Sequence, residues 1–244
     1  MAFDVERVRA RFPGREIVWR ATTTSTMEDA AGLTAPGSVA VADEQTAGQG
    51  RFGRRWHSER ASGLYVSVVL EPRGVTPALT LALGVAAGEA ITAATGVACD
   101  LRWPNDVLIG GRKCAGILVQ LHGDAAVSGI GINVNHSGFP AGIADLATSL
   151  RIATGREQSR EQLLIELLDS VDRHLELLEY RGPGAVLDLF AAASSYVLGR
   201  RVAVDLGGEV LRGTTDGLDP AGFLWLRCED GSRRLILSGG VRPA

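Results

Sequence analysis

The glycine-rich stretch at residues 48–53, which reads GQGRFG, places the sharpest constraint on how this chain folds. It matches the G-x-G-x-x-G pattern of dinucleotide-binding folds, in which the glycines join a strand to a helix. The apolar run at residues 38–42 predicts the strand, but residues 54–60 offer no apolar face for a helix. No glycine is followed by the Lys-Ser/Thr pair of a P-loop either. The glycines therefore predict a flexible loop that is not a dinucleotide fingerprint.

Composition limits the classes of partner. The 244-residue chain is long enough for one large domain with a small appendage, and its 45% hydrophobic content supports a packed core. A net charge of -3 leaves no basic surplus to displace counterions, so no nucleic-acid partner is expected. Cys99, Cys114 and Cys228 are widely spaced and odd in number, which favours neither a disulfide framework nor a zinc site.

The location of the protein is predicted from what the chain lacks. Residues 1–12 carry charges and have no apolar core of a signal peptide. The apolar uncharged run at residues 75–88 is shorter than a membrane span and ends at Glu89. We therefore expect a cytoplasmic protein with no membrane partner. The histidines show no metal-ligand spacing: His57, His122, His136 and His174.

The apolar pattern changes near residue 200. Before that point it predicts strands mixed with helices, and after it only short strands separated by turns, which is typical of a small β-barrel. The expected strands or extended segments are residues 17–19, 38–42, 64–70, 101–103, 107–109, 113–121 and 127–134. The expected helices are residues 27–33, 77–95, a long one beginning after Ser159, and a short one ending near residue 193. The fold class is therefore α+β.

Lysine usage singles out one residue. The chain has 25 basic residues, and only Lys113 is a lysine. Arginine is a planar fork and lysine a compact point charge, so a surviving lysine indicates a position where one ammonium must fit between oxygens. Survival by chance is the alternative that the count leaves open.

The glycine-rich loop also carries cations and aromatic rings. Arg51, Arg54 and Arg55 offer bidentate donors to carboxylate or phosphate, and Trp56 offers a plane for stacking. This composition predicts a loop that folds over an anionic ligand with an aromatic part. The alternative is a solvated loop that Phe52 and Trp56 anchor to the protein.

Four blocks carry a resemblance to a known family. Residues 44–56 (EQTAGQGRFGRRW), 102–106 (RWPND), 112–118 (RKCAGIL) and 129–133 (GIGIN) resemble, in this order, the signature blocks of biotin protein ligases. The resemblance extends over nearly the whole chain and is to the monofunctional type without an N-terminal DNA-binding domain. It implies a mixed-sheet catalytic domain with helices on one side over residues 1–193. An SH3-like β-barrel is implied over residues 194–244.

The resemblance implies an ATP-dependent, AMP-forming ligase that uses Mg²⁺. Biotin would be activated to biotinyl-5′-AMP and then transferred to a lysine of a biotin carboxyl carrier protein. A homodimer is compatible with this type. Two alternatives stay open: a lipoate-type ligase or acyltransferase on the related scaffold, and a non-catalytic biotin-binding module.

The resemblance also implies roles for individual residues. Catalytic roles fall to Lys113 between the two reacting anions, to Arg51, and to Asp106, which is also the candidate Mg²⁺ ligand. Biotin contacts are implied for Ser25, Thr26, Met27, Gln45, Gly48, Gln49, Gly50, Arg51, Lys113 and Gly116. ATP contacts are implied for Arg51, Arg54, Trp56, Asn105, Asp106, Lys113 and Asn133. The chain departs from the family at Met27, where asparagine is usual, and at Gln49, where many members have arginine.

Some of these residues also fit purely local roles. Ser25 opens an S-x-x-E capping box and is suited to cap the helix that follows. Asn105 and Asp106 follow Pro104, and such pairs are common in turns.

Overall fold

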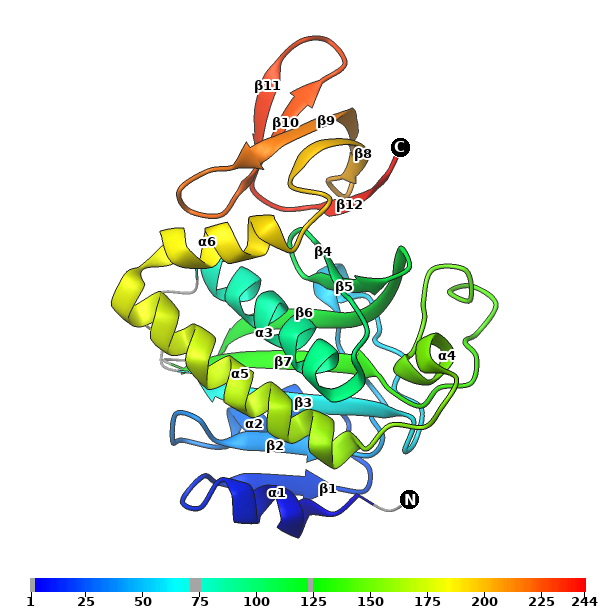
Figure 1. Ribbon diagram of the computed structural model, residues 1–244, viewed down its shortest axis with the longest axis vertical. Coiled ribbons are helices and arrows are strands. Elements are labelled where there is room, and N and C mark those ends of the chain that lie inside the picture. The colour runs from blue at the N-terminus through cyan, green and yellow to red at the C-terminus, as the bar shows by residue number, and fades with distance from the viewer. Residues whose placement is uncertain (1–2, 71–75, 123–124) are drawn as a thin grey trace.

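The computed structural model describes residues 3–70, 76–122 and 125–244, so Met1 and Val75, which begin two of the segments considered above, lie outside the described residues. Figure 1 shows a large α+β part below a smaller all-β part that carries the C-terminus. The described chain thus has the predicted fold class.

The larger sheet is mixed. Its order is β1-β2-β3-β7-β6-β5-β4, and β1 and β2 are parallel while the other neighbours are antiparallel. The strands are β1 (Ile17–Arg20), β2 (Val39–Ala42), β3 (Gly63–Leu70), β4 (Asp100–Arg102), β5 (Asp106–Ile109), β6 (Arg112–His122) and β7 (Ala125–Asn133). All eight positions of β3 are buried, because helices cover both faces at the centre of the sheet.

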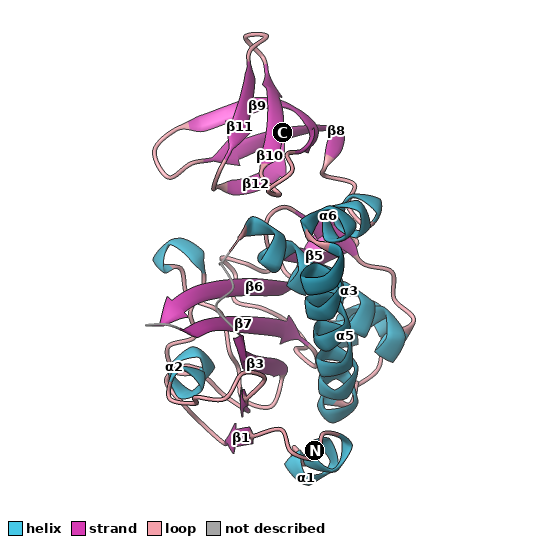
Figure 2. Cartoon of the chain, turned by 90° about the vertical axis from the view of Figure 1, so that its left-hand side faces the viewer, coloured by secondary structure: helices cyan, strands magenta, loops and turns pink. Residues whose placement is uncertain are grey.

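The helices divide unequally between the two faces of this sheet. The larger ones cover one face, while α2 lies on the other (Figure 2). The helices are α1 (Val5–Arg11), α2 (Thr26–Ala31), α3 (Pro77–Thr95), α4 (Leu150–Thr154), α5 (Arg160–Arg181) and α6 (Pro183–Ala192). On the α2 side, Met27 and Ala30 pack against Ala40, Val69 and Val127. The expectation of helices on one side is confirmed for the long helices, and α2 refines it.

Helix α3 is the central helix of the core. It has the length and mean hydropathy, 1.5, of a membrane-spanning helix, but 67% of that window is buried inside the protein. Leu81, Ala82, Leu83 and Ile91 are fully enclosed, and the helix packs along α5. Such burial is typical of a core helix of a folded domain.

The β5–β6 hairpin delivers two charged residues to the same place. Gly110 and Gly111 adopt left-handed φ angles of 57° and 77°, as the tight turn requires. The register then pairs Leu108 with Lys113 and Asp106 with Gly116. The predicted hairpin is confirmed, and its register places Asp106 and Lys113 side by side.

The glycine-rich stretch forms a loop with one 3₁₀ turn, η1 (Arg51–Gly53). Its ends are joined by hydrogen bonds from Gly50 N to Arg54 O, 2.7 Å, and from Trp56 N to Gly48 O, 2.9 Å. No α-helix follows it before β3 in this described segment, which confirms the prediction against a dinucleotide fold.

The C-terminal part is a small antiparallel sheet of order β11-β10-β9-β8-β12. Its strands are β8 (Leu198–Asp205), β9 (Val210–Leu218), β10 (Leu224–Cys228), β11 (Arg233–Ile236) and β12 (Gly240–Pro243). The indole Nε1 of buried Trp103 donates to Gly222 O at 2.9 Å, which ties this SH3-like unit to the larger part.

A buried ion pair connects the end of β2 to the start of α5. Arg160 Nη1 lies 2.6 Å from Asp43 Oδ1, and the two residues are 4% and 8% exposed. We predict that Asp43→Asn lowers the free energy of unfolding by about 3 kcal/mol, because it removes a charged partner 2.6 Å from a buried guanidinium. Urea unfolding measures this change, with Asp169→Asn in the exposed Arg11–Asp169 pair as control. Equal effects of the two substitutions would contradict the prediction.

Candidate active site

A cavity of about 650 Å³ lies where the glycine-rich loop, the β5–β7 end of the large sheet and strand β12 meet. Its walls come from α2, from residues 49–57, from β6 and β7, and from residues 239–243 of the C-terminal part. The cavity therefore needs both parts of the described chain to be complete.

Glycines form the floor of the cavity. Gly116 of β6 and Gly131 of β7 are direct partners in the sheet. A Cβ at Gly131 would lie 2.5 Å from the Trp56 ring, and a Cβ at Gly116 would lie 3.0 Å from the end of Lys113. A Cβ at Gly129 would lie 2.6 Å from the sulfur of Met27. Because these glycines have no side chains the floor is flat, and the planar ring of Trp56 lies close to the backbone there.

Charged side chains meet at one position along this floor. Lys113 Nζ lies 2.5 Å from Asp106 Oδ1, and Arg102 Nη2 lies 2.7 Å from Asp106 Oδ2. Burial alone would raise the pKa of Asp106, but the charges and hydrogen bonds of Lys113 and Arg102 hold it below its ordinary value. The carboxylate therefore stays ionised and fixes the Lys113 ammonium at the cavity. Two cations share one anion here, so the cluster carries net positive charge.

Arg51 links the glycine-rich loop to both parts of the chain. Its Nη1 donates to Asn105 Oδ1 and to Gly239 O, each at 3.1 Å. Asn105 is fixed in turn, because its Nδ2 donates to Ile117 O at 2.8 Å. Burial lowers the pKa of Arg51 from its ordinary value, with Asp106 opposing this shift. Arg51 thus brings a further cation to the cavity wall.

A cluster of uncharged polar side chains lies at the α2 side of the cavity. Gln45 Oε1 accepts from Thr26 N at 2.9 Å, and Gln45 Nε2 donates to Ser58 Oγ at 2.9 Å. Thr26 Oγ1 also lies 2.8 Å from Ser67 Oγ. Ser25 is fully buried, and its Oγ accepts from Met27 N at 3.3 Å as the cap of α2. These groups alternate donors and acceptors, as recognition of an uncharged polar ring requires.

The structure brings nearly all the sequence-predicted site residues to this one cavity. They are Ser25, Thr26, Met27, Gln45, Gln49, Gly50, Arg51, Arg54, Trp56, Asn105, Asp106, Lys113, Gly116 and Asn133. Gly48 packs against Ser58 and Trp56 instead, since a Cβ there would lie within 2.8 Å of Ser58 Oγ and Trp56 O. Its absence of a side chain serves the loop backbone.

Protein groups are the partners of two residues with implied ATP contacts, and also of the loop residue Arg55. Asn133 is buried, and its Nδ2 donates to Thr148 O at 3.0 Å, which holds the segment after β7. Arg54 faces Asp205 of the C-terminal part at 3.6 Å, and Arg55 donates to Thr46 O.

The residues present do not suit Asp106 as a direct Mg²⁺ ligand. Each of its carboxylate oxygens already faces a cation, Lys113 on one side and Arg102 on the other. A divalent ion there would need at least one of these pairs to break against like charge.

Sequence reasoning missed several residues of the cavity. Arg102 stands out in the sequence only as part of a block, although a turn at Pro104 would make Arg102 and Asp106 opposite each other in a hairpin, as the register has them. The β12 residues Val241 and Arg242 carry no local signature, so only the chain path reveals them. His57 and His136, which show no ligand spacing in the sequence, lie with ring centroids 5.7 Å apart.

Comparison with known proteins decides the family. Residues 18–137 match the Biotin/lipoate A/B protein ligase family, and residues 197–241 match the Biotin protein ligase C terminal domain. The bifunctional ligase/repressor BirA of Bacillus spizizenii is 34% identical over 91% of this chain and 72% of its own length. The biotin--[acetyl-CoA-carboxylase] ligase of Mycobacterium tuberculosis is 31% identical over 97% of this chain and 94% of its own. The chain belongs to the biotin protein ligase family.

A solved biotin protein ligase supports the same assignment. The enzyme of Aquifex aeolicus, determined in complex with biotin and ATP, superposes with a TM-score of 0.86 at 32% identity. The match covers 94% of this chain and 99% of that one. This biotin protein ligase therefore shares the arrangement of both parts with that enzyme.

The glycine floor generates a prediction about Trp56. We predict that Gly131→Ala displaces the indole, because the added methyl group overlaps the ring, while the fold is retained. The near-ultraviolet circular dichroism spectrum should change while the far-ultraviolet spectrum does not. Gly138→Ala is the matched control, since a Cβ there meets nothing within 4 Å. Identical near-ultraviolet spectra for both variants would refute the close contact.

Proposed function

We propose that this protein activates biotin with ATP to biotinyl-5′-AMP and transfers the biotinyl group to a lysine of a biotin carboxyl carrier protein. The observation that carries this proposal is the position of the Lys113 ammonium. It lies at a flat glycine floor, fixed by Asp106, within the same cavity as a cluster of neutral donors and acceptors. Such a cavity suits a flat, uncharged ring that carries a carboxylate.

In the first half-reaction, a biotin carboxylate oxygen attacks the α-phosphate of ATP and pyrophosphate leaves. Two anions must approach each other, so the main demand on the protein is fixed positive charge. Lys113 lies between the two groups in this proposal, and Arg51 neutralises a phosphate from the loop side. Asp106 and Arg102 position the ammonium in advance, so little reorganisation is needed during the reaction.

The two substrates occupy different ends of the cavity. We assign the ureido ring of biotin to the polar cluster of Ser25, Thr26 and Gln45, whose hydrogen-bonding atoms lie beside α2. Met27, Gln49, Gly50 and Gly116 complete the biotin wall in this assignment. The nucleotide takes the end lined by Arg54, Trp56, Asn105 and Asn133. Mg²⁺, which this reaction class would use, would be carried by the ATP phosphates instead of by Asp106, and would supply positive charge to them.

In the second half-reaction, the amine of the carrier lysine attacks the carbonyl carbon of the mixed anhydride, and AMP leaves. The anhydride must be kept from water until the carrier arrives. The loop that contains Arg51 is suited to this role, because it reaches Gly239 on the opposite wall of the cavity. Closing the loop separates the intermediate from solvent.

Several finer expectations remain part of this proposal. We propose the domain boundaries 1–193 and 194–244 and action in the cytoplasm. The lack of nucleic-acid and membrane partners stays a prediction, as does a homodimer.

Lipoate is the competing substrate, because the family that matches residues 18–137 includes lipoate ligases. ATP/pyrophosphate exchange, measured separately with biotin and with lipoate, tests the choice. We expect exchange with biotin only. Exchange with lipoate alone would overturn the proposed substrate.

The role of Lys113 is tested by Lys113→Arg. We predict a loss of adenylate formation of at least ~100-fold, equivalent to about 2.7 kcal/mol, because a planar fork cannot replace a point charge between two oxyanions. Arg112→Lys, at the exposed neighbouring position, is the matched control and should keep normal exchange activity. Full turnover by Lys113→Arg would remove the reason for assigning this residue, and would favour a non-catalytic binding module.

The role of the loop is tested by Gly50→Val. A Cβ at Gly50 would lie 3.1 Å from Arg54 O, so a branched side chain hinders closure of the loop without disturbing the core. We predict that the folded variant releases or hydrolyses biotinyl-5′-AMP faster in a single-turnover experiment. Gly208→Val, in the exposed β8–β9 turn, provides the control. Unchanged retention of the adenylate would contradict the proposed closure.

A further inference from the structure

Three potential metal ligands from two distant segments meet at the edge of the cavity. His57 and Glu59 follow the glycine-rich loop, while His136 follows β7. Each residue offers a ligand atom that lies within 4.8 Å of the other two. The side chains range from fully buried His136 through half-buried His57 to exposed Glu59. No role in biotin activation has been assigned to any of them.

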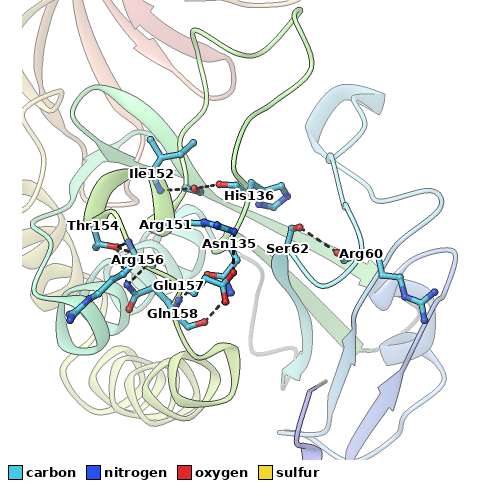
Figure 3. A network of polar contacts seen from close by, with 11 residues as sticks. Arg60, Ser62, Asn135, His136, Arg151, Ile152, Thr154, Arg156, Glu157 and Gln158 are labelled. Carbon is cyan, nitrogen blue, oxygen red and sulfur yellow. Dashed lines mark hydrogen bonds and ion pairs between the residues drawn. The ribbon is translucent and has the colours of Figure 1, made fainter. Parts of the chain in front are cut away.

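His136 is held rigidly at this position. Its carbonyl oxygen accepts from Ser149 Oγ at 2.6 Å. The preceding Asn135 donates through its backbone N to Ser62 O at 2.6 Å and through Nδ2 to Gln158 O at 3.0 Å. Figure 3 shows this network around His136, with the imidazole on the side of the segment that carries Ser62. The backbone that carries the ring is therefore fixed in place.

The hydrogen bonds of Tyr65 select one tautomer of His136. The Tyr65 hydroxyl has one proton and donates it to Glu59 O at 2.8 Å. Its contact of 3.4 Å with His136 Nε2 therefore has the ring nitrogen as donor. The proton is then on Nε2, and Nδ1 keeps a free lone pair. This Nδ1 is buried and has no hydrogen-bond partner within the described residues.

The tautomer that Tyr65 selects suits a metal ligand. An imidazole whose N–H is fixed by a neighbour while its other nitrogen is free is the usual arrangement of a metal-binding histidine.

We propose that His57, Glu59 and His136 bind one divalent transition-metal ion of the zinc type. Two imidazoles and one carboxylate are a ligand set that Zn²⁺ accepts, with a fourth position open to water. A tetrahedral zinc site places its ligand atoms about 3.4 Å apart, so His57 and Glu59, the more exposed pair, close in by rotating their side chains.

The bound ion joins the two segments that flank the cavity. One segment ends the glycine-rich loop, and the other begins the chain between β7 and α4. The site therefore stabilises the cavity walls without contacting the reacting groups. The competing account is an apolar role for His136, which stacks on Phe139 with ring centroids 5.1 Å apart.

Zinc binding to the metal-stripped full-length protein tests the proposal without biotin or ATP, so it is independent of the proposed enzyme activity. Competition with a chromogenic chelator measures the affinity and stoichiometry. We expect one Zn²⁺ per chain and a rise in Tm on binding. His57→Gln and Glu59→Gln should each weaken binding at least ~10-fold, the lower limit found even for outer-shell partners.

Controls separate this site from other zinc-binding groups. His174→Gln in α5 and Glu229→Gln in the C-terminal part should bind zinc as the unaltered protein does. His136→Gln should abolish binding. If this buried variant misfolds, His57→Gln and Glu59→Gln still test the site. Absence of stoichiometric binding, or equal affinity in His57→Gln, Glu59→Gln and the controls, would overturn the proposed site.

Discussion

The pair between Lys113 and Asp106 is the interaction on which the rest of this site depends. An ammonium that must lie between two repelling anions has to be fixed before they arrive, and the ionised Asp106 does this at 2.5 Å. Arg102 supports the carboxylate from its other oxygen. Burial alone would favour a protonated Asp106, but Lys113 and Arg102 lower its pKa and keep the carboxylate ionised. The positive charge of the cluster is consequently in place without substrate.

The fold explains how this pair comes to face a cavity. The glycine turn of the β5–β6 hairpin sets a register that brings Asp106 and Lys113 to neighbouring positions. Glycines on β6 and β7 then let Trp56, Met27 and the end of Lys113 lie close against the sheet. Arg51 connects the covering loop to Asn105 below and to Gly239 of the C-terminal part. The glycines of β6 and β7, the Lys113–Asp106 pair and the glycine-rich loop are thus linked by direct contacts. A change in one of them is expected to affect the others.

Much of this arrangement is predictable from the sequence. The lack of a helical pattern after residue 53 excludes a dinucleotide fold, and the count of one lysine points to Lys113. Local patterns also predict the hairpin and the long helices. They cannot predict that Asn133 holds a neighbouring segment, since its partner Thr148 belongs to a loop without a local signature. The meeting of His57 with His136 is hidden because ligand spacing in a sequence reveals only local sites, and these two residues lie far apart along the chain.

The single lysine allows a direct measurement of the central claim. Protein labelled with ¹⁵N at the lysine side chain has one Nζ signal, that of Lys113, besides the background. We predict that this signal shifts in Asp106→Asn, and that it shifts in the unaltered protein when biotin and a non-hydrolysable ATP analogue are added together. A signal that stays in place under both changes would show that the ammonium neither pairs with Asp106 nor meets the two anions, and would contradict the account.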